Sequence, residues 1–319
     1  MNEKIKIIHG NCIDKIKELN DKSIDCVVSS PPYFGLRDYG VDGQFGLEKT
    51  YYDYIANTVK VFETFKPKLK DTATIWWNVG DSYSSGTRKT TTLQTVRKPK
   101  STEILNSKQK YLDGLIVRPP FQNGIKEKDL MMIPNRVAIA LQDAGWYIRS
   151  EIIWHKPNPM PESVKDRPTS CHEKIWLITK NKKYYYDYKS IKEPAKNWGT
   201  RNRKTGSAFV DGTPGRSKQS GGKNCNFALT GKNKRNVWTI TTKPCREAHF
   251  ATFPKDLIEP CIKAGCPEGG VVLDPFGGSG TTGIVAALNN RNAILIELNQ
   301  NYIDIANKRI NKEVGLFNG

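Results

Sequence analysis

The sequence of 319 residues predicts an α/β domain built on a mostly parallel sheet. Short runs rich in β-branched residues alternate with stretches of helical apolar spacing, a pattern typical of strand–helix–strand units. This alternation fails over residues 84–128 and 184–246, and it resumes after each of them. We therefore expect one discontinuous α/β domain that carries two insertions.

The first half of the chain supplies most of the expected elements. KIKIIHG and SIDCVVSS have the β-branched content of strands, whereas YYDYIANTVKVFETFKPKL has the apolar spacing of a helix. We expect strands at 4–10, 23–30, 72–80, 146–154 and 174–180, and helices at 12–20, 51–69 and 133–145.

The last part of the chain returns to regular structure after the second insertion. FPKDLIEPCIKAG has a proline in the first turn of a predicted helix, where a missing backbone N–H costs little. VVLDPFGGSGTTGIVAALNN is a strand, a glycine-rich turn and a helix, NAILIELN is a further strand, and NYIDIANKRINK is a final helix.

The net charge of +18 is concentrated in the two insertions. Residues 182–246 hold 16 Lys and Arg against 3 Asp and Glu, and residues 84–120 hold 8 against 2. The rest of the chain is close to neutral. Two concentrated basic regions on a neutral body indicate a polyanionic partner.

Membrane, secreted and metal-binding classes are disfavoured. No run of about 18 apolar residues is present, and the N-terminus lacks the apolar stretch of a signal peptide. The seven cysteines are scattered and form no C-x-x-C pair, so we expect reduced thiols in a cytoplasmic protein and no metal site.

The glycine-rich turn in LDPFGGSGTTG predicts a small-molecule site. Glycines there allow a tight turn and close approach of a ligand, and the following helix presents free N–H groups. Glu297 ends the next strand, a position suited to ribose hydroxyls. The absence of G-K-[ST] excludes a P-loop, while NAD and nucleotide phosphates stay open. Asp274 before the turn would repel phosphate but attract a cationic ligand such as S-adenosylmethionine.

The stretch VVSSPPYFGLRDYG ends a predicted strand in two adjacent prolines. Prolines donate no backbone hydrogen bonds and hold the chain extended, so they form a stiff ledge with free carbonyl oxygens. Tyr33 projects beyond this ledge. A proline-terminated strand at a domain edge would explain the same residues.

Together these segments resemble the amino-group DNA methyltransferases. Their catalytic motif resembles SSPPY and their cofactor motif resembles DPFGGSGTT; HGNC, GWYIRSEIIWHKPNP and HFATFP also look like family segments. The catalytic motif precedes the cofactor motif here, an order that resembles the β class. The resemblance implies a Rossmann-like S-adenosylmethionine-dependent methyltransferase fold, with circularly permuted motifs, a seven-stranded mostly parallel sheet and helices on both faces.

The resemblance also divides the chain. Residues 1–183 would form the catalytic half, with a basic loop insertion at about 84–128. Residues 184–246 would be the target-recognition region, and residues 247–319 the cofactor-binding half.

Site residues follow from matching positions in the motifs. In the family the loop after the first strand often reads Gly-Asp and touches adenine, and here the Asp is replaced by Asn11. We expect S-adenosylmethionine to contact Asn11, Cys12, Phe253, Asp274, Pro275, Phe276, Gly278, Ser279, Gly280, Thr281, Thr282, Glu297 and Asn299.

The ledge would act on an exocyclic amine, whose lone pair is conjugated with its ring. Ser30 Oγ and the Pro31 carbonyl would accept its N–H groups, Pro32 would keep the ledge rigid, and Tyr33 would stack on the base. A base paired in duplex DNA cannot reach this ledge, so it would be flipped out. A ring-carbon mechanism is disfavoured because Pro244-Cys245 lies outside the catalytic loop.

The expected substrate is duplex DNA, with methylation of cytosine N4 favoured because Ser heads the motif. Adenine N6, an RNA or other free amine, and a DNA-binding protein without catalysis remain alternatives. We expect a monomer or homodimer in a bacterial or phage-encoded setting, with a companion restriction endonuclease as a candidate partner. The predicted DNA-contacting residues are Arg37, Arg88, Lys89, Arg201, Arg203, Lys204, Lys234 and Arg235.

Overall fold

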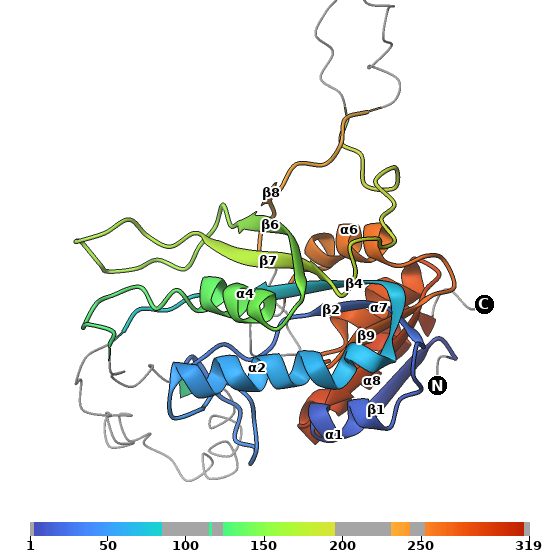
Figure 1. Cartoon of the computed structure of the whole chain (residues 1–319), viewed down its shortest axis with the longest axis horizontal. Helices are drawn as coiled ribbons and strands as arrows, with labels where there is room; N and C mark the ends of the chain where they lie inside the picture. The colour runs from blue at the N-terminus through green and yellow to red at the C-terminus, as the bar shows by residue number, and fades with distance from the viewer. Residues whose placement is uncertain (1–2, 85–114, 117–123, 195–230, 243–252, 316–319) are drawn as a thin grey trace, which may run out of the picture.

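The computed structural model describes residues 3–84, 115–116, 124–194, 231–242 and 253–315. Their centre is a mixed sheet in the order β1-β10-β9-β2-β4-β7-β6-β8 (Figure 1). Its strands are β1 (Ile5–His9), β2 (Ile24–Ser29), β4 (Leu69–Val79), β6 (Tyr147–His155), β7 (His172–Thr179), β8 (Val237–Thr239), β9 (Val271–Asp274) and β10 (Asn292–Glu297).

The expected mostly parallel sheet is confirmed, with one strand more than predicted. β1, β10, β9, β2 and β4 run parallel, and β7 is antiparallel to both of its neighbours. The eighth strand is β8, which pairs with β6 in parallel and lies inside the region predicted as target recognition. Its three residues are too few to produce a visible alternation in the sequence.

The chain order places the two ends of the protein in one half of the sheet. β9 and β10 insert between β1 and β2, so that Val27 of β2 is in register with Leu273 of β9. The strand that leads to the ledge therefore lies beside the strand that leads to the glycine-rich turn.

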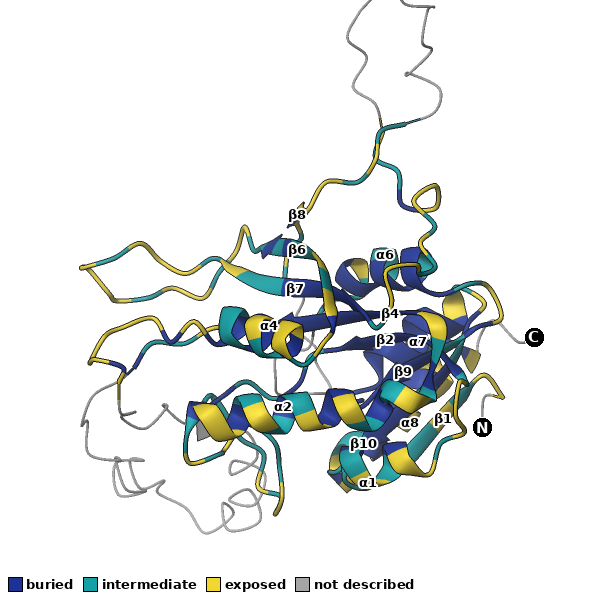
Figure 2. Ribbon diagram, in the orientation of Figure 1, coloured by how far each residue is buried: buried dark blue, intermediate teal, exposed yellow. Residues whose placement is uncertain are grey.

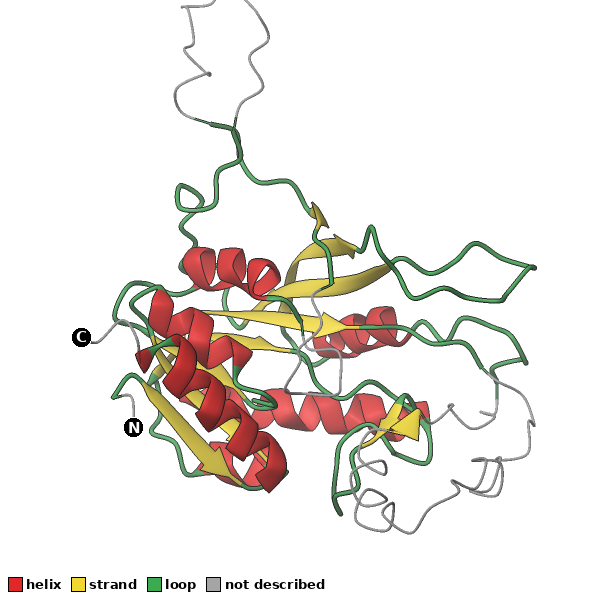
Figure 3. Cartoon of the chain, turned by 180° about the vertical axis from the view of Figure 1, so that it is seen from behind, coloured by secondary structure: helices red, strands yellow, loops and turns green. Residues whose placement is uncertain are grey.

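Helices of the described chain cover both faces of the sheet, as Figures 1 and 3 show from opposite sides. Buried residues from one set join one core cluster with the strands, and buried residues from the other set join two further clusters. The first set is α1 (Cys12–Lys17), α2 (Tyr51–Phe65) and α4 (Ile133–Asp143); the second is α6 (Lys255–Gly265), α7 (Thr281–Leu288) and α8 (Gln300–Glu313).

Helix α2 is shorter than predicted and has clear boundaries. It begins at a capping box in which Thr50 and Asp53 satisfy each other's backbone N–H groups. The prediction of a helix through residue 69 was wrong, because Pro67 cannot donate the next helical hydrogen bond. The chain instead forms a short 3₁₀ turn at Lys66–Lys68, and β4 then starts at Leu69.

The central strands are buried on both faces, as Figure 2 shows. Every residue of β2 is buried, including the polar Asp25 and Ser29 as well as the apolar residues between them. On the α2 side, the rings of Phe62, Trp77 and Trp146 pack edge to face. On the other side, Trp76 packs near Trp238 of β8. Among these placed residues, no helix has both the length and the apolarity to cross a membrane.

Candidate active site

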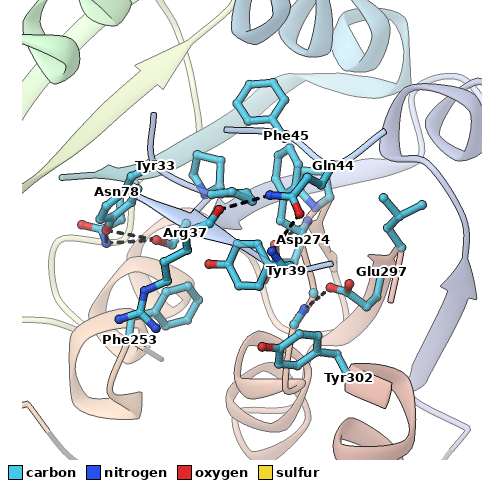
Figure 4. A pocket seen from close by; sticks show the side chains of 18 of the residues that line it. Tyr33, Arg37, Tyr39, Gln44, Phe45, Asn78, Phe253, Asp274, Glu297 and Tyr302 are labelled. Carbon is cyan, nitrogen blue, oxygen red and sulfur yellow. Dashed lines mark hydrogen bonds between the residues drawn. The ribbon is translucent and has the colours of Figure 1, made fainter. Parts of the chain in front are cut away.

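A cavity of about 810 Å³ lies where the parallel strands β1, β2, β4, β9 and β10 reach their carboxyl ends (Figure 4). This edge is where ligands bind in open α/β sheets. All four ledge residues line the cavity, and so do eleven of the thirteen predicted cofactor residues. The eleven are Asn11, Cys12, Phe253, Asp274, Pro275, Phe276, Gly278, Ser279, Thr281, Glu297 and Asn299.

Asp274 holds the glycine-rich turn against the end of β2. One carboxylate oxygen accepts hydrogen bonds from Ser29 Oγ at 2.6 Å and from the Phe276 backbone N–H at 3.1 Å. The other oxygen accepts from Thr282 Oγ1 at 2.6 Å. Its burial raises the pKa of this carboxyl from 3.8 to about 6, against the lowering effect of these three donors. Asp274 therefore shapes the cavity wall chiefly through the protein's own hydrogen bonds.

Glu297 presents a carboxylate to the cavity from the end of β10. Its two oxygens accept the backbone N–H groups of Gly278 and Asn299, each at 2.8 Å. Burial raises the pKa of this carboxyl above its ordinary value. Each carboxylate oxygen can accept more than one hydrogen bond, so Glu297 retains capacity for hydroxyl donors of a ligand.

The outer wall of the turn is fixed by helix α8. Arg309 is buried and donates to the Ser279 carbonyl and Oγ, both at 2.7 Å, and to Thr281 Oγ1 at 3.0 Å. Gly280 packs against Ala306, to which an added Cβ would approach within 3.0 Å. Sequence reasoning missed Arg309, which appears there as one of several basic residues on an amphipathic helix.

Two predicted cofactor residues do not line the cavity. Gly280 backs onto α8, and its positive φ of 81° lets the chain turn into α7. Thr282 is fully buried below the turn, where it donates to Asp274. Both residues support the turn from the side away from the cavity, whereas their neighbours Ser279 and Thr281 face the cavity.

The first loop contributes Asn11 and Cys12 to the opposite wall. Asn11 caps helix α1 by accepting the Ile13 backbone N–H through its side-chain oxygen, at 2.9 Å. Burial raises the pKa of the Cys12 thiol to about 12, so Cys12 is an apolar wall residue.

The ledge follows directly from β2. The Pro32 carbonyl accepts a hydrogen bond from the Tyr54 hydroxyl at 3.1 Å, whereas the Pro31 carbonyl has no partner among the described residues. Gly46 packs so closely on Pro32 and the Tyr33 carbonyl that a Cβ would lie 3.0 to 3.1 Å from them. The ledge is therefore held from one side, with the Pro31 carbonyl left as an acceptor.

A partly buried hydrogen-bond network surrounds the tip of the ledge. The Tyr33 hydroxyl donates to Glu173 at 2.6 Å, and Asn78 Nδ2 donates to the Tyr33 hydroxyl at 2.8 Å. Ser30 Oγ donates to the same hydroxyl at 3.2 Å and accepts from Asn78 Nδ2 at 3.2 Å. Burial, with the adjacent Glu173 charge, raises the pKa of Tyr33 well above its ordinary value. The sequence did not single out Asn78 or Glu173.

A segment between the ledge and α2 joins the two parts of the site. Phe45 packs on Phe276 with ring centroids 5.3 Å apart, and Asn299 donates to the Tyr39 carbonyl at 3.4 Å. Arg37, in the two-residue strand β3 (Arg37–Asp38), lines the cavity beside this segment (Figure 4). β3 pairs with β5 (Leu115–Ile116) in a separate small ribbon.

Of the other predicted DNA contacts, the two that the structure describes, Lys234 and Arg235, do not line this cavity. Lys234 and Arg235 precede β8 and line a small separate hollow with Trp238, over which Lys234 lies 4.9 Å from the ring centroid. The remaining predicted contacts lie outside the described residues: Arg88, Lys89, Arg201, Arg203 and Lys204. Over the placed parts of the chain, His, Cys, Asp and Glu form no cluster of three suited to a metal.

The cavity suits a ligand with a ribose and a positively charged group. Glu297 offers carboxylate oxygens, Phe276 and Phe253 offer apolar walls, and the glycine-rich turn allows close approach of the ligand. Fold and site together define a Rossmann-like methyltransferase that uses S-adenosylmethionine. The protein belongs to the N6/N4 methyltransferase family of DNA methylases, whose family model matches residues 24–308.

Curated relatives agree with this assignment over nearly the whole chain. The type II methyltransferase M.SmaI of Serratia marcescens is 44% identical over 305 residues, covering 96% of this chain and 90% of the relative. The type II methyltransferase M.Cfr9I of Citrobacter freundii is 42% identical over 307 residues, covering 96% and 88%. DNA methyltransferase activity is thereby supported for this chain.

Solved structures support the fold at lower identity. The cytosine-N4-specific PvuII DNA methyltransferase gives a TM-score of 0.63 at 17% identity, covering 99% of this chain and 92% of that chain. M1.HpyAVI, solved as a complex with S-adenosylmethionine, gives a TM-score of 0.52 at 18% identity, covering 96% and 99%.

Proposed function

We propose that this protein methylates the exocyclic N4 amine of a flipped-out cytosine at a specific site in duplex DNA. The single observation that carries the proposal is that the Ser30–Tyr33 ledge and the glycine-rich turn line the same cavity. An acceptor surface for an amine therefore stands beside a pocket suited to the methyl donor.

The ledge would prepare the amine for attack. Ser30 Oγ and the unpartnered Pro31 carbonyl are two acceptors on adjacent residues, and a cytosine amine has two N–H groups to donate. Accepting both hydrogen bonds favours a pyramidal nitrogen whose lone pair faces away from the ledge. S-adenosylmethionine, when bound, supplies a methyl group on a positively charged sulfur that is a good leaving group. Orientation then provides most of the acceleration.

Tyr33 would hold the base in place by stacking. Its ring is fixed on one side by Gly80 and at its hydroxyl by Asn78 and Glu173. A rigid aromatic at the ledge repays part of the few kcal/mol that unpairing and unstacking a base costs. A base that is paired inside a duplex cannot bring its amine to the ledge, and this supports base flipping.

The basic regions support duplex DNA as the substrate. The predicted insertions carry most of the charge excess of the chain, and Lys and Arg neutralise phosphates. We assign residues 184–246 to target recognition and residues 1–183 and 247–319 to the two halves of the catalytic domain. β8, within the first of these ranges, also extends the sheet.

Cytosine N4 is preferred over adenine N6 because the motif is headed by Ser30, and the PvuII enzyme of the same fold is cytosine-N4-specific. The names of M.SmaI and M.Cfr9I as type II methyltransferases support a role in restriction and modification, with a companion endonuclease as partner.

Nucleoside analysis tests the proposed base directly. Duplex DNA of mixed sequence is incubated with the protein and S-adenosylmethionine, digested to nucleosides and separated by mass spectrometry, with an RNA sample in parallel. N4-methylcytosine in DNA alone is the expected product. N6-methyladenine would keep the ledge chemistry and replace the base, and a methylated product found in RNA alone would overturn the DNA assignment.

A further inference from the structure

Glu173 is an acidic residue that is hydrogen-bonded to Tyr33 of the ledge and has no assigned role. It lies near the start of β7 with only 15% of its side chain exposed, and it lines the cavity. One carboxylate oxygen accepts from the Tyr33 hydroxyl at 2.6 Å and from Asn78 Nδ2 at 3.0 Å. The other oxygen forms an ion pair with Lys156. Glu173 is thus connected to the ledge by a hydroxyl and an amide.

The carboxylate sets the direction of the hydrogen bonds that lead to the ledge. An ionised carboxylate only accepts, so the Tyr33 hydroxyl must donate its proton to Glu173. The Tyr33 oxygen is then left to accept, which it does from Asn78 Nδ2 and from Ser30 Oγ. Because Ser30 spends its proton on Tyr33, its remaining lone pair is available to accept from a base amine.

We propose that Glu173 is a positioning residue for methyl transfer, which orients Ser30 as an acceptor and takes up the proton that the amine releases. This rests on the proposed function. When the nitrogen forms its bond to the methyl carbon, it carries one proton too many. That proton passes to Ser30 Oγ, the Ser30 hydroxyl proton passes to the Tyr33 oxygen, and the Tyr33 hydroxyl proton passes to Glu173.

Lys156 fits this role by holding the carboxylate in place. Its ammonium lies 4.4 Å from the centroid of the Trp154 ring and pairs with the oxygen of Glu173 that does not face the ledge. Its side chain is 20% exposed, so the pair is only partly screened by solvent. A carboxylate held from behind by a cation keeps its free lone pairs directed at the Tyr33 hydroxyl.

The same sheet contains a matched ion pair without this connection. Glu151 on β6 pairs with Lys174 on β7 at 2.6 Å, and the pair lies outside the cavity lining. Replacing Glu151 removes an interstrand ion pair of the same kind and leaves the ledge untouched. It therefore separates a general effect on the β6–β7 pairing from an effect on the amine.

The test compares Glu173→Gln, Tyr33→Phe and Glu151→Gln with the parent in single-turnover methyl transfer on duplex DNA. S-adenosylmethionine affinity is measured by calorimetry, and flipping by the fluorescence of 2-aminopurine at the target base. We expect Glu173→Gln to lower the transfer rate constant about 100-fold, with cofactor affinity and flipping within about twofold of the parent. Glu151→Gln should retain the parent rate.

A double variant keeps the proposal falsifiable. Tyr33→Phe breaks the connection while keeping the ring, so adding Glu173→Gln to it should lower the rate no further. A Glu173→Gln rate within about threefold of the parent, or a loss seen only in affinity or flipping, would overturn the role of Glu173. An inactive parent on every DNA would instead reject the proposed function.

Discussion

Gly80 is predicted to control the rate of methyl transfer without touching either substrate. A Cβ at this position would lie 2.4 Å from Cε2 and 2.8 Å from Cδ2 of the Tyr33 ring, where ordinary contacts are 3.4 Å or longer. The backbone at Gly80 has no strained φ, so Gly80→Ala acts through this clash alone. The Tyr33 ring must move by roughly 1 Å, and a misplacement of that size can cost about 100-fold in rate.

The assay is single-turnover methyl transfer on duplex DNA, with S-adenosylmethionine affinity measured on the same preparation. Gly315→Ala is the matched control, because an added Cβ there has no neighbour within 4 Å. We expect Gly80→Ala to lose about 100-fold in rate while its cofactor affinity stays unchanged. A Gly80→Ala protein as fast as Gly315→Ala would refute the claim that the Tyr33 ring position limits transfer.

Two further predictions concern stability. Gly265→Ala would place a Cβ 2.3 Å from both Thr74 Oγ1 and Trp76 Nε1, which are buried, so denaturant unfolding should show a loss of about 1–3 kcal/mol with the transfer rate per folded molecule retained; an unchanged midpoint would contradict this packing. The pKa of Asp274 is raised from 3.8 to about 6 in the folded chain. Between these pH values the folded chain therefore binds more protons than the unfolded chain. The contribution of Asp274 to stability then falls as pH rises through that window. The stability of the parent relative to Asp274→Asn should therefore fall by about 1 kcal/mol from pH 5 to pH 7, and a constant difference would refute the shifted pKa.

The order of helices and strands could be predicted because each element has its own local signal. β2 carries the β-branched and apolar residues of a buried strand, and α2 has both its capping box and its apolar spacing. The exact end of α2 and the strand β8 were missed. A single proline decides the first, and the second depends on pairing with β6, which short-range pattern does not contain.

The cavity could be predicted only in part for a similar reason. The ledge and the glycine-rich turn are contiguous motifs, so their residues stand out along the chain. Asn78, Glu173 and Arg309 reach the site from β4, β7 and α8 through pairing and packing. In the sequence they are an amide in a strand, an acid in a strand and a basic residue on a helix. Such residues are common at solvent-exposed positions, so nothing in the sequence marks these three as part of a site.

Asp274 has a structural role in addition to the one suggested by the sequence. The sequence suggested an acid facing a cationic ligand. In the structure three donors from Ser29, Phe276 and Thr282 occupy the carboxylate, so the residue ties β2 to the turn. The ledge and the turn are thus joined by one buried hydrogen-bonded acid.

The most direct measurement for the whole account is the single-turnover transfer rate of Ser30→Ala on duplex DNA. The variant removes only the hydroxyl that would accept a hydrogen bond from the exocyclic amine. The Pro31 carbonyl and the Tyr33 ring remain. We predict a loss of at least about 100-fold, with DNA affinity and S-adenosylmethionine affinity unchanged. Transfer at the parent rate would contradict the proposal that the ledge accepts and orients the exocyclic amine.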